Sequence, residues 1–430
     1  MIRRTRRDFL RASLKGAGLL AAPTIIPATA LGLGGRVAPS ERIVLGGIGV
    51  GNRGSGVLRW MLGEPDVQFV ADCDIQKARR ERVKTMVDEI QGNTDCKLYD
   101  DADAFLAERT DIDAMLVTTG DRMHATMSVK ALRAGKDVYS EKPSSMTVAE
   151  GQAVVEAARR YGRVYQTGVQ RLSEANFTFA NELLRTGRLG RLHTVRAHIA
   201  GGGCGSHAWL PGEPEPSKDE CNWDAWLGPC PWRPYNKSYV AGGWRGYYDF
   251  HTGAIGEWGA HTIAQCQVAM GLGETSGIHY GYVETESGDG MRIRYANGVT
   301  MILQQKGWHG SCGVQYEGNE GWVAVADGYS TLDTSSPALL TDFAKLTKEY
   351  SLRTGRALSH VRNFFDCIKS RERTVTNEDV MHRSMTTVHC ANICMWLKRD
   401  LTWDPAREAF VNDDAANRLR ARARRPGWEM

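Results

Sequence analysis

Long hydrophobic runs and metal-binding signatures are both missing from this 430-residue chain. After the N-terminus, no stretch approaches the ~18 uninterrupted apolar residues of a membrane-spanning helix, so we expect no stable membrane span in the mature chain. The ten cysteines include no C-x-x-C pair and no H-E-x-x-H occurs, so we expect no metal site, although His251, Glu257 and His261 lie close in sequence. A Cys221–Cys230 disulfide stays open, because spacing alone cannot establish it.

A strong charge imbalance is also absent once the N-terminus is set aside. The formal net charge is +4, but residues 1–30 contain six Lys and Arg residues against one Asp. That surplus of five leaves the rest of the chain at −1. A nearly neutral chain offers no electrostatic basis for a nucleic-acid partner, and we expect none.

Residues 1–30 have the order of an export signal. A basic start is followed by a short small-and-apolar stretch, residues 17–26, and then by Ala28-Thr29-Ala30, a small-x-small cleavage site. Within residues 5–11, the Arg6-Arg7 pair resembles a twin-arginine signal. We therefore predict a signal peptide over residues 1–30, a linker over 31–42 and a periplasmic or otherwise exported protein. An uncleaved leader and a plain basic tail stay open as alternatives.

The segment after the linker indicates a strand followed by a glycine-rich turn. An apolar run from residue 43 leads into Gly49-x-Gly51-x-x-Gly54, and residues 55–62 follow as a helix. Glycines at these positions permit a tight turn, a close backbone approach to a pyrophosphate and close packing of helix on strand. The N-terminal amides of the helix would face the phosphates. This pattern predicts a dinucleotide-binding turn.

An acid stands where such a turn needs one. A second strand, residues 67–71, leads to Asp74, twenty residues after Gly54, and an acid at that distance binds the hydroxyls of the adenosine ribose. The carboxylate would repel a 2′-phosphate, so it favours NAD. Lys77, Arg79 and Arg80 leave NADP open, although they could equally form a solvated helix face.

Strand and helix patterns alternate through the rest of the first half. Strands are expected at residues 113–119, 137–140 and 163–168, with helices at 125–134 and from the capping box at Thr147 to about 160. We predict an α/β fold with a doubly wound parallel Rossmann sheet over residues 43–168. Residues 169–430 are predicted to form an α+β substrate-binding and oligomerisation domain with a large mixed, mostly antiparallel sheet. Its expected strands include 291–295, 300–304 and 321–326, and the basic stretch 418–425 is expected to be a frayed helix.

Several motifs follow one another along the chain: the glycine turn with Asp74, residues 120–124 after a strand, Glu141-Lys142-Pro143, residues 168–173 and residues 253–261. In this order and combination they resemble the Gfo/Idh/MocA family of sugar and polyol oxidoreductases. The resemblance covers essentially the whole chain after the leader, and residues 362–364 and 403–405 are similar to exported bacterial members. It implies a homo-oligomer and a nicotinamide dinucleotide held by Gly49, Gly51, Asn52, Arg53, Gly54, Asp74, Thr119, His124, Glu141, Lys142 and Gln170.

The resemblance also implies a catalytic set of Lys142, Glu257 and His261. Glu257 stands where the family usually has Asp, which shifts the carboxylate by about one methylene and leaves its exact role open. Removal of hydride from a carbinol requires that the hydroxyl proton also leave, and the intrinsic pKa of His261 suits that base. Glu257 and His261 are four residues apart and are expected on one face of a helix. A packed core histidine is the alternative for His261.

Half of the twelve tryptophans lie within residues 209–258. Aromatic faces stack on the C–H faces of sugars, and charged side chains bind hydroxyls, so the cluster favours a carbohydrate pocket. The candidate substrate-binding residues are Arg171, Trp232, Trp244, Arg245, Asp249 and His251. Ordinary packing is the alternative for any single tryptophan.

An exported enzyme has no ready supply of free nucleotide, so we expect the cofactor, NAD or NADP, to be tightly bound. The sequence predicts an NAD(P)-dependent oxidoreductase that acts on a CH–OH group of a small carbohydrate by hydride transfer. Two alternatives stay open. One is a redox-neutral glycosidase that oxidises, eliminates, hydrates and rereduces its substrate, as related members of the superfamily do. The other is a non-enzymatic sugar-binding protein with a structural dinucleotide.

Overall fold

The computed structural model describes residues 37–199, 206–283, 289–304, 312–327, 332–341, 343–355 and 358–430. The twin-arginine motif, the cleavage site and Cys204 lie outside the described residues. Residues 1–42 form one unit, whose described element is the 3-10 helix η2 (Pro39–Glu41), and residues 43–430 form another. Among the described helices, none combines the length and the apolar character that crossing a membrane requires. The described cysteines, including Cys221 and Cys230, are buried free thiols.

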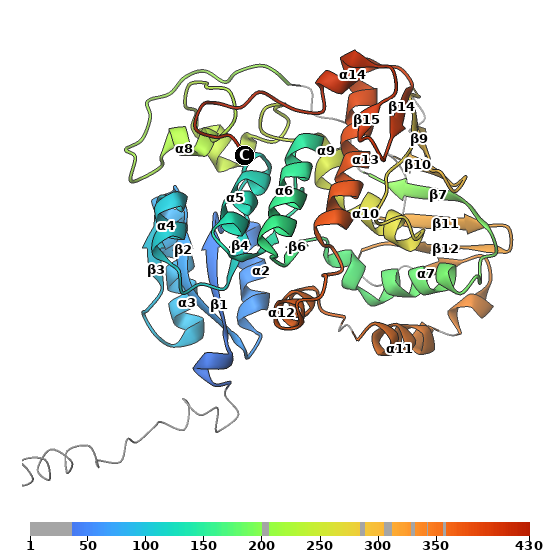
Figure 1. Cartoon of the computed structure of the whole chain (residues 1–430), viewed down its shortest axis with the longest axis horizontal. Coiled ribbons are helices and arrows are strands. Elements are labelled where there is room, and N and C mark those ends of the chain that lie inside the picture. Colours follow the sequence, from blue (N-terminus) through green and yellow to red (C-terminus); the bar gives the residue numbers. More distant parts are fainter. Residues whose placement is uncertain are drawn as a thin grey trace, which may run out of the picture. The chain divides into compact units, whose positions relative to one another are not determined.

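A six-stranded parallel sheet forms the first half of unit 43–430 (Figure 1). Its strands are β1 (Ile43–Ile48), β2 (Val67–Cys73), β3 (Lys97–Tyr99), β4 (Ala114–Val117), β5 (Asp137–Ser140) and β6 (Tyr165–Thr167). The connecting helices are α2 (Asn52–Leu62), α3 (Lys77–Gln91), α4 (Ala102–Glu108), α5 (Asp121–Arg133) and α6 (Val148–Tyr161). The spatial order β3-β2-β1-β4-β5-β6 reverses between β1 and β4, which places a ligand crevice at the carboxyl ends of these two strands. The predicted doubly wound Rossmann sheet is confirmed.

Local sequence signals located most of these elements. The hydroxyl of Thr147 accepts a hydrogen bond from the amide of Glu150 at 3.1 Å, so the predicted cap of α6 is confirmed. The sequence did not reveal α3, because only Val83, Met86 and Val87 supply its buried apolar surface on an otherwise charged helix. β3 has three residues, too few for an alternating pattern.

The second half contains a nine-stranded sheet in the order β13-β12-β11-β7-β10-β9-β8-β14-β15. The strands are β7 (Leu192–His198), β8 (His279–Gly281), β9 (Asp289–Arg294), β10 (Thr300–Gln304), β11 (Val314–Gly318), β12 (Gly321–Val325), β13 (Leu332–Thr334), β14 (Leu401–Asp404) and β15 (Ala409–Phe410). The β7–β10 pair is parallel and the other described pairs are antiparallel, which confirms the mixed, mostly antiparallel sheet.

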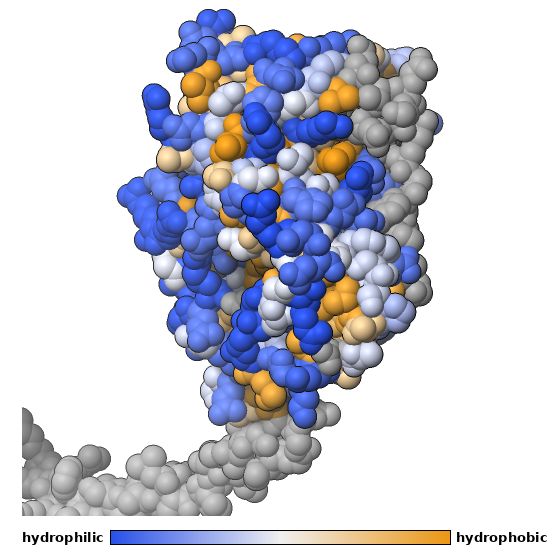
Figure 2. All heavy atoms as spheres, turned by 90° about the vertical axis from the view of Figure 1, so that its right-hand side faces the viewer, coloured by the Kyte–Doolittle hydropathy of each residue, from blue (hydrophilic) through white to orange (hydrophobic). Residues whose placement is uncertain are grey.

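Helices bury one face of this sheet against the core. The remaining helices are η3 (Gln170–Ser173), α7 (Ala175–Arg185), α8 (Trp223–Leu227), η4 (Tyr239–Gly243), α9 (Gly253–Glu257), α10 (Gly259–Ala269), η5 (Pro337–Leu340), α11 (Phe343–Thr354), α12 (His360–Ser370), α13 (Glu378–Leu397) and α14 (Asp414–Arg418). Side chains of α7, α10 and α13 share one core cluster with β7, β10 and β11. The face turned to the viewer in Figure 2 is mostly hydrophilic, with hydrophobic residues in small separate patches, so its visible part marks no large apolar docking surface. The homo-oligomer stays a prediction.

Helix α12 returns from the C-terminal half to complete the Rossmann core. Its Phe364 and Phe365 are fully buried in one cluster with Val57 and Leu58 of α2. Arg362 of the same helix donates to Asp66, which precedes β2, at 2.7 and 3.1 Å. The predicted boundary at residue 168 assigns α12 to the second domain, whereas its side chains pack in the core of the first. Contacts between segments this distant in sequence leave no local signal.

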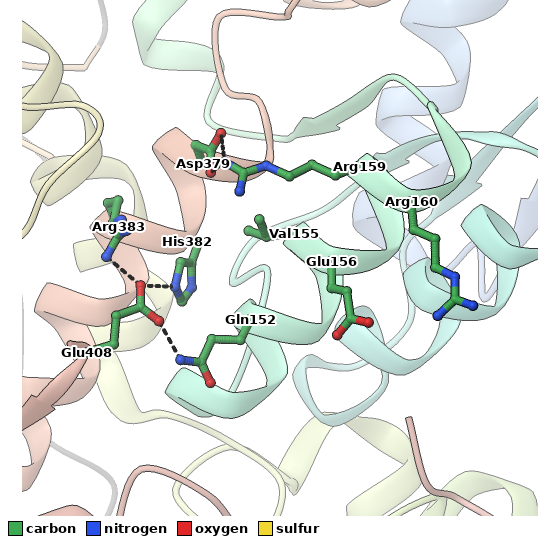
Figure 3. Close-up of a pocket in the computed structure, with 9 residues that line it drawn as sticks. All are labelled: Gln152, Val155, Glu156, Arg159, Arg160, Asp379, His382, Arg383 and Glu408. Atoms are coloured by element: carbon green, nitrogen blue, oxygen red, sulfur yellow. Dashed lines mark hydrogen bonds and ion pairs between the residues drawn. The ribbon is translucent and has the colours of Figure 1, made fainter. Parts of the chain in front are cut away.

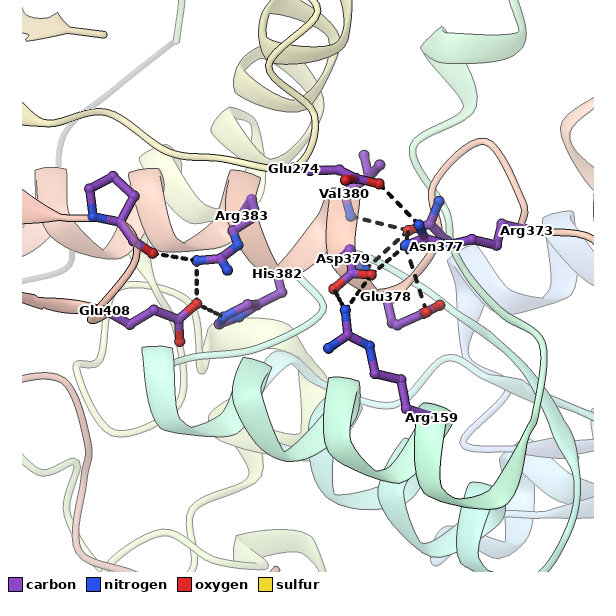
Figure 4. Close-up of polar contacts among 11 residues, drawn as sticks. Arg159, Glu274, Arg373, Asn377, Glu378, Asp379, Val380, His382, Arg383 and Glu408 are labelled. Carbon is purple, nitrogen blue, oxygen red and sulfur yellow. Dashed lines mark hydrogen bonds and ion pairs between the residues drawn. The ribbon is translucent and has the colours of Figure 1, made fainter. Parts of the chain in front are cut away.

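Helix α13 joins the two halves by packing along α6 (Figure 1). Arg159 of α6 donates to both carboxylate oxygens of Asp379 at 2.6 and 2.8 Å, next to the Asn377 cap of α13 (Figure 4). A cavity of about 670 Å³ lies over this junction (Figure 3). Within it, Glu408 accepts hydrogen bonds from Gln152, His382 and Arg383. Charge-assisted hydrogen bonds at Asp379 and at Glu408 therefore fix this junction.

We expect Phe364→Ala to lower the free energy of unfolding by about 3–5 kcal/mol, since it leaves a cavity in the Rossmann core. Leu352→Ala on α11 is the matched control, because Leu352 is 74% exposed. Urea unfolding of both variants measures the difference. Equal stability of the two variants would contradict the placement of α12 in this core.

Candidate active site

The glycine turn is packed too closely against its neighbours to accept side chains at Gly49 and Gly54. Gly49 has a φ of +70°, and a Cβ there would collide with Thr119. A Cβ on Gly54 would collide with Thr118, and one on Gly51 would lie 3.2 Å from the guanidinium of Arg79. Helix α2 begins at the next residue, so its free amides face the turn. The turn therefore fits a pyrophosphate, with Arg79 as an additional positive charge.

Asp74 lies at the carboxyl end of β2, where an adenosine ribose is expected. The residue is buried, and its Oδ1 accepts a hydrogen bond from the amide of Gln76 at 2.8 Å. Burial raises the pKa of Asp74, and the charge of Arg79 opposes that rise. Arg80 is also buried and donates to the Asp74 carbonyl and to Asp219 at 3.1 and 2.6 Å. The interpretation of Arg80 as a solvated helix face is therefore wrong, because its guanidinium is buried and binds the exposed Asp219.

A cavity of about 280 Å³ lies between the two halves of unit 43–430 and gathers most of the predicted site. It is lined by Arg53, Thr118, Thr119, Asp121, His124, Glu141, Lys142, Arg171, Trp244, Arg245, Glu257, Trp258 and His261. Trp232 and Asp249 do not line it. Trp232 is 58% exposed and its ring lies edge-on to Trp209, whereas Asp249 pairs with the buried Arg233.

Glu257 is the charged centre of this cavity. Its Oε1 lies 4.0 Å from Lys142 Nζ and 3.3 Å from Arg245 Nε, and its Oε2 lies 3.3 Å from His251 Nε2. The hydrogen bond from His251 lowers the pKa of Glu257 to about 2, against the opposing effect of burial, and Lys142 and Arg245 add to the lowering. Glu257 is therefore an anion that holds Lys142, and a weak base.

His261 follows on the next helix. α9 ends at Glu257 and α10 begins at Gly259, so the expected single helix is interrupted at Trp258. His261 is 3% exposed, and its Nδ1 has no hydrogen-bond partner in the described part of the chain. Burial, followed by the charge of Lys142, lowers the pKa of His261 well below its ordinary value of 6.5. The imidazole is therefore neutral, and it lines the cavity together with Lys142 and Glu257.

Asp121, the first residue of α5, contributes to the site, although the sequence reasoning assigned it no role. Its carboxylate is buried and Oδ2 lies 3.6 Å from His251 Nε2. His251 Nδ1 accepts the amide of Gly253 at 3.2 Å, so the ring proton is on Nε2 and faces both carboxylates. His251 therefore lies behind Glu257 and does not line the cavity. The sequence did contain a signal for Asp121, because an acid begins the helix that follows β4, one of the two strands between which the sheet order reverses.

Other predicted cofactor residues, and Arg171 of the predicted substrate site, line the cavity, whereas Asn52 does not. Glu141 Oε1 accepts from Gln170 Nε2 at 3.0 Å and lies 3.4 Å from Arg53 Nε. The ring of His124 lies between the carbonyls of Thr119 and Pro143, and burial lowers its pKa to about 4. The guanidinium of Arg171 is held by both carboxylate oxygens of Asp327 at 2.5 and 2.6 Å. Asn52 is exposed and accepts a hydrogen bond from Arg82 at 3.1 Å.

Two domain families describe this architecture. Residues 43–169 match the oxidoreductase family's NAD-binding Rossmann fold, and residues 205–430 match its C-terminal alpha/beta domain. The chain belongs to the Gfo/Idh/MocA oxidoreductase family. The glycine turn before α2, the buried Asp74 at the end of β2 and the cavity lined by Lys142 fit a nicotinamide dinucleotide across the crevice.

Curated relatives match only part of the chain. Inositol 2-dehydrogenase of Salmonella typhimurium is 30% identical over 146 residues, which are 34% of this chain and 42% of that protein. Glycosyl hydrolase family 109 protein 1 of Bacteroides thetaiotaomicron is 34% identical over 112 residues, 26% of this chain and 24% of that protein. The chain thus spans less than half the length of these relatives.

Solved structures share the fold over most of the chain. The WlbA dehydrogenase of Chromobacterium violaceum, solved with NADH and UDP-GlcNAcA, has a TM-score of 0.60 at 17% identity and covers 86% of this chain and 98% of its own. The aldose-aldose oxidoreductase of Caulobacter crescentus, solved with glycerol, has a TM-score of 0.56 at 17% identity, with 84% and 99% covered.

We expect Asp121→Asn to become more stable relative to wild type as pH rises from 4 to 7. Burial raises the pKa of Asp121 from 3.8 to about 6, so ionisation opposes folding above pH 3.8, and this penalty is complete above pH 6. Asparagine carries no such charge, and the gain should reach up to about 3 kcal/mol. Urea unfolding across this range measures it, with the exposed Asp95→Asn as control. A stability difference that does not vary with pH would show that Asp121 is not held in this buried environment.

Proposed function

We propose that this chain is an NAD-dependent enzyme that oxidises a CH–OH group of a sugar or polyol in the cavity around Lys142, Glu257 and His261. The observation that carries the proposal is the buried imidazole of His261, which lines one cavity together with Lys142 and Glu257. The cavity therefore offers a hydroxyl-bearing ligand both a neutral imidazole and a lysine side chain.

The side chains have separable roles in such a reaction. A nicotinamide bound beyond the glycine turn would accept hydride from the carbinol carbon. As the C–H bond breaks, the O–H bond also breaks and the His261 imidazole takes the proton, which a neutral imidazole can do. Lys142 donates to the same oxygen and stabilises its developing negative charge. Glu257, with its pKa lowered to about 2, stays ionised and holds the ammonium in place.

The nucleotide proposed is NAD. The Asp74 carboxylate lies where the ribose hydroxyls are expected and would repel a 2′-phosphate. Arg80, a candidate partner for such a phosphate, already binds Asp219. Arg79 Nη1 lies 3.2 Å from the position of a Cβ on Gly51, so this guanidinium is placed at the pyrophosphate turn.

We also propose that residues 1–30 direct export through the twin-arginine pathway and that NAD stays bound through successive turnovers. The support is the arginine motif together with the lack of free nucleotide outside the cytoplasm. A redox-neutral glycosidase is the second candidate, supported by the similarity to a glycosyl hydrolase family 109 protein. In that reaction His261 would also be the base, because Glu257 is a weak one.

We expect the purified protein to release NAD when denatured, and its native form to show nicotinamide reduction when aldoses or polyols are added. His261→Ala should slow this reduction about 100- to 10,000-fold while retaining nucleotide, because the proton loses its acceptor. The control is His193→Ala, since His193 is exposed. Nucleotide-free protein, or a wild-type rate in His261→Ala, would overturn the proposal. Release of an aglycone from aryl glycosides without net nicotinamide reduction would favour the glycosidase.

A further inference from the structure

A second cavity, of about 340 Å³, opens beside the glycine turn at the carboxyl ends of β2 and β3. Gly49 and Thr119 line it, and Thr119 also lines the cavity that contains His261. The two cavities therefore meet across the turn. Since a dinucleotide crosses such a turn at its pyrophosphate, this second cavity corresponds to the adenosine half, with Asp74 on its wall.

Both halves of the chain contribute apolar side chains to the lining of this second cavity. Met123 and Met127 come from α5, Trp226 from α8 and Trp428 from the end of the chain. Trp428, together with Met430, packs on the same core cluster as the two methionines. Thioether and indole groups of this kind bind a flat aromatic base.

Residues 217–226 of the second half, called the cover segment here, form backbone hydrogen bonds with the residues that follow Asp74. The amide of Lys77 donates to the Glu220 carbonyl at 3.1 Å, and the amide of Asn222 donates to the Ile75 carbonyl at 3.3 Å. The guanidinium of Arg122 lies 3.5 Å from the ring centre of Trp226 and donates to its carbonyl at 2.7 Å. The cover segment is thus fixed to both α3 and α5.

The C-terminal tail, residues 419–430, closes the remaining side, and the chain ends beside α5 and α8 (Figure 1). Arg424 donates to Glu150 of α6 at 2.8 Å. Arg425 donates to Asp224 of the cover segment at 2.6 Å and to the Gly228 carbonyl at 2.8 Å. The ring of Trp428 lies 5.1 Å from Lys130 Nζ of α5. The prediction of a helix over residues 418–425 is wrong beyond Arg418, because these contacts hold the tail in a non-helical path.

We propose that Trp428 and the C-terminal tail form one wall of an adenosine-binding pocket and slow the release of the bound nucleotide. The inference rests on the proposed function in that it requires a dinucleotide at the glycine turn. The contacts of the tail with the cover segment and with α5 hold Trp428 at this cavity, so they would oppose the departure of a bound base. Such a barrier acts on the dissociation rate, which is the quantity that an exported enzyme must keep low.

ADP-ribose is the probe, because it carries the adenosine half and takes no part in hydride transfer. We expect Trp428→Ala to release ADP-ribose about 10- to 100-fold faster than wild type, as loss of a base–aromatic contact does elsewhere. Arg425→Gln should accelerate release as well, because it frees the tail from Asp224. Stopped-flow competition on the full-length protein measures both rates.

Matched controls are Tyr161→Ala, an exposed aromatic on α6, and Arg407→Gln, an exposed arginine. Both should release ADP-ribose at the wild-type rate. Trp428→Phe keeps a flat ring and should stay within about threefold of wild type, which separates a base contact from general destabilisation. Release rates of Trp428→Ala and Arg425→Gln equal to the controls would overturn the inference, as would a wild-type protein that binds no ADP-ribose. If ADP-ribose release is slow and depends on Trp428 but the protein oxidises no sugar, the inference about the tail is supported. Only the proposed function is then contradicted.

Discussion

The carboxylate of Glu257 is the contact on which the rest of the site depends. It lies 4.0 Å from Lys142, which follows β5 in the Rossmann half, and 3.3 Å from both Arg245 and His251 in the other half. A bound nicotinamide would bring a further positive charge close to Lys142. Without a nearby anion, these like charges would repel one another in a partly dehydrated cavity. Glu257 therefore allows the ammonium and the cofactor to occupy one site.

This contact requires that the two halves of the chain be held at a fixed distance, because catalytic groups must be placed within a fraction of an ångström. The C-terminal third of the chain supplies that rigidity. Phe364 and Phe365 of α12 are packed into the Rossmann core, and Asp379 of α13 binds Arg159 of α6. His261 lies on α10, which packs against α13. His261 and Lys142 are thus positioned by a framework of helices that cross between the sheets.

The sequence predicted those features that depend on neighbours in the chain. The glycine turn, Asp74 and most of the Rossmann strands follow from short patterns, because each is formed by consecutive residues with strict conformational or hydrophobic demands. Features made by distant segments were not predictable. Trp232 and Trp244 look alike in sequence, yet only Trp244 lines the cavity. The role of Asp121, the ion pair of the buried Arg80 with Asp219 and the crossing of α12 all depend on tertiary contacts.

A crystal structure of the protein with NAD and a reactive sugar tests the proposed active site most directly. The decisive measurement is the distance from the reacting hydroxyl to its protein partners. We expect that oxygen to lie within ~3.2 Å of an imidazole nitrogen of His261 and of Lys142 Nζ, with its carbon facing the nicotinamide ring. A sugar whose reacting hydroxyl lies beyond hydrogen-bond distance of both groups would contradict the assignment.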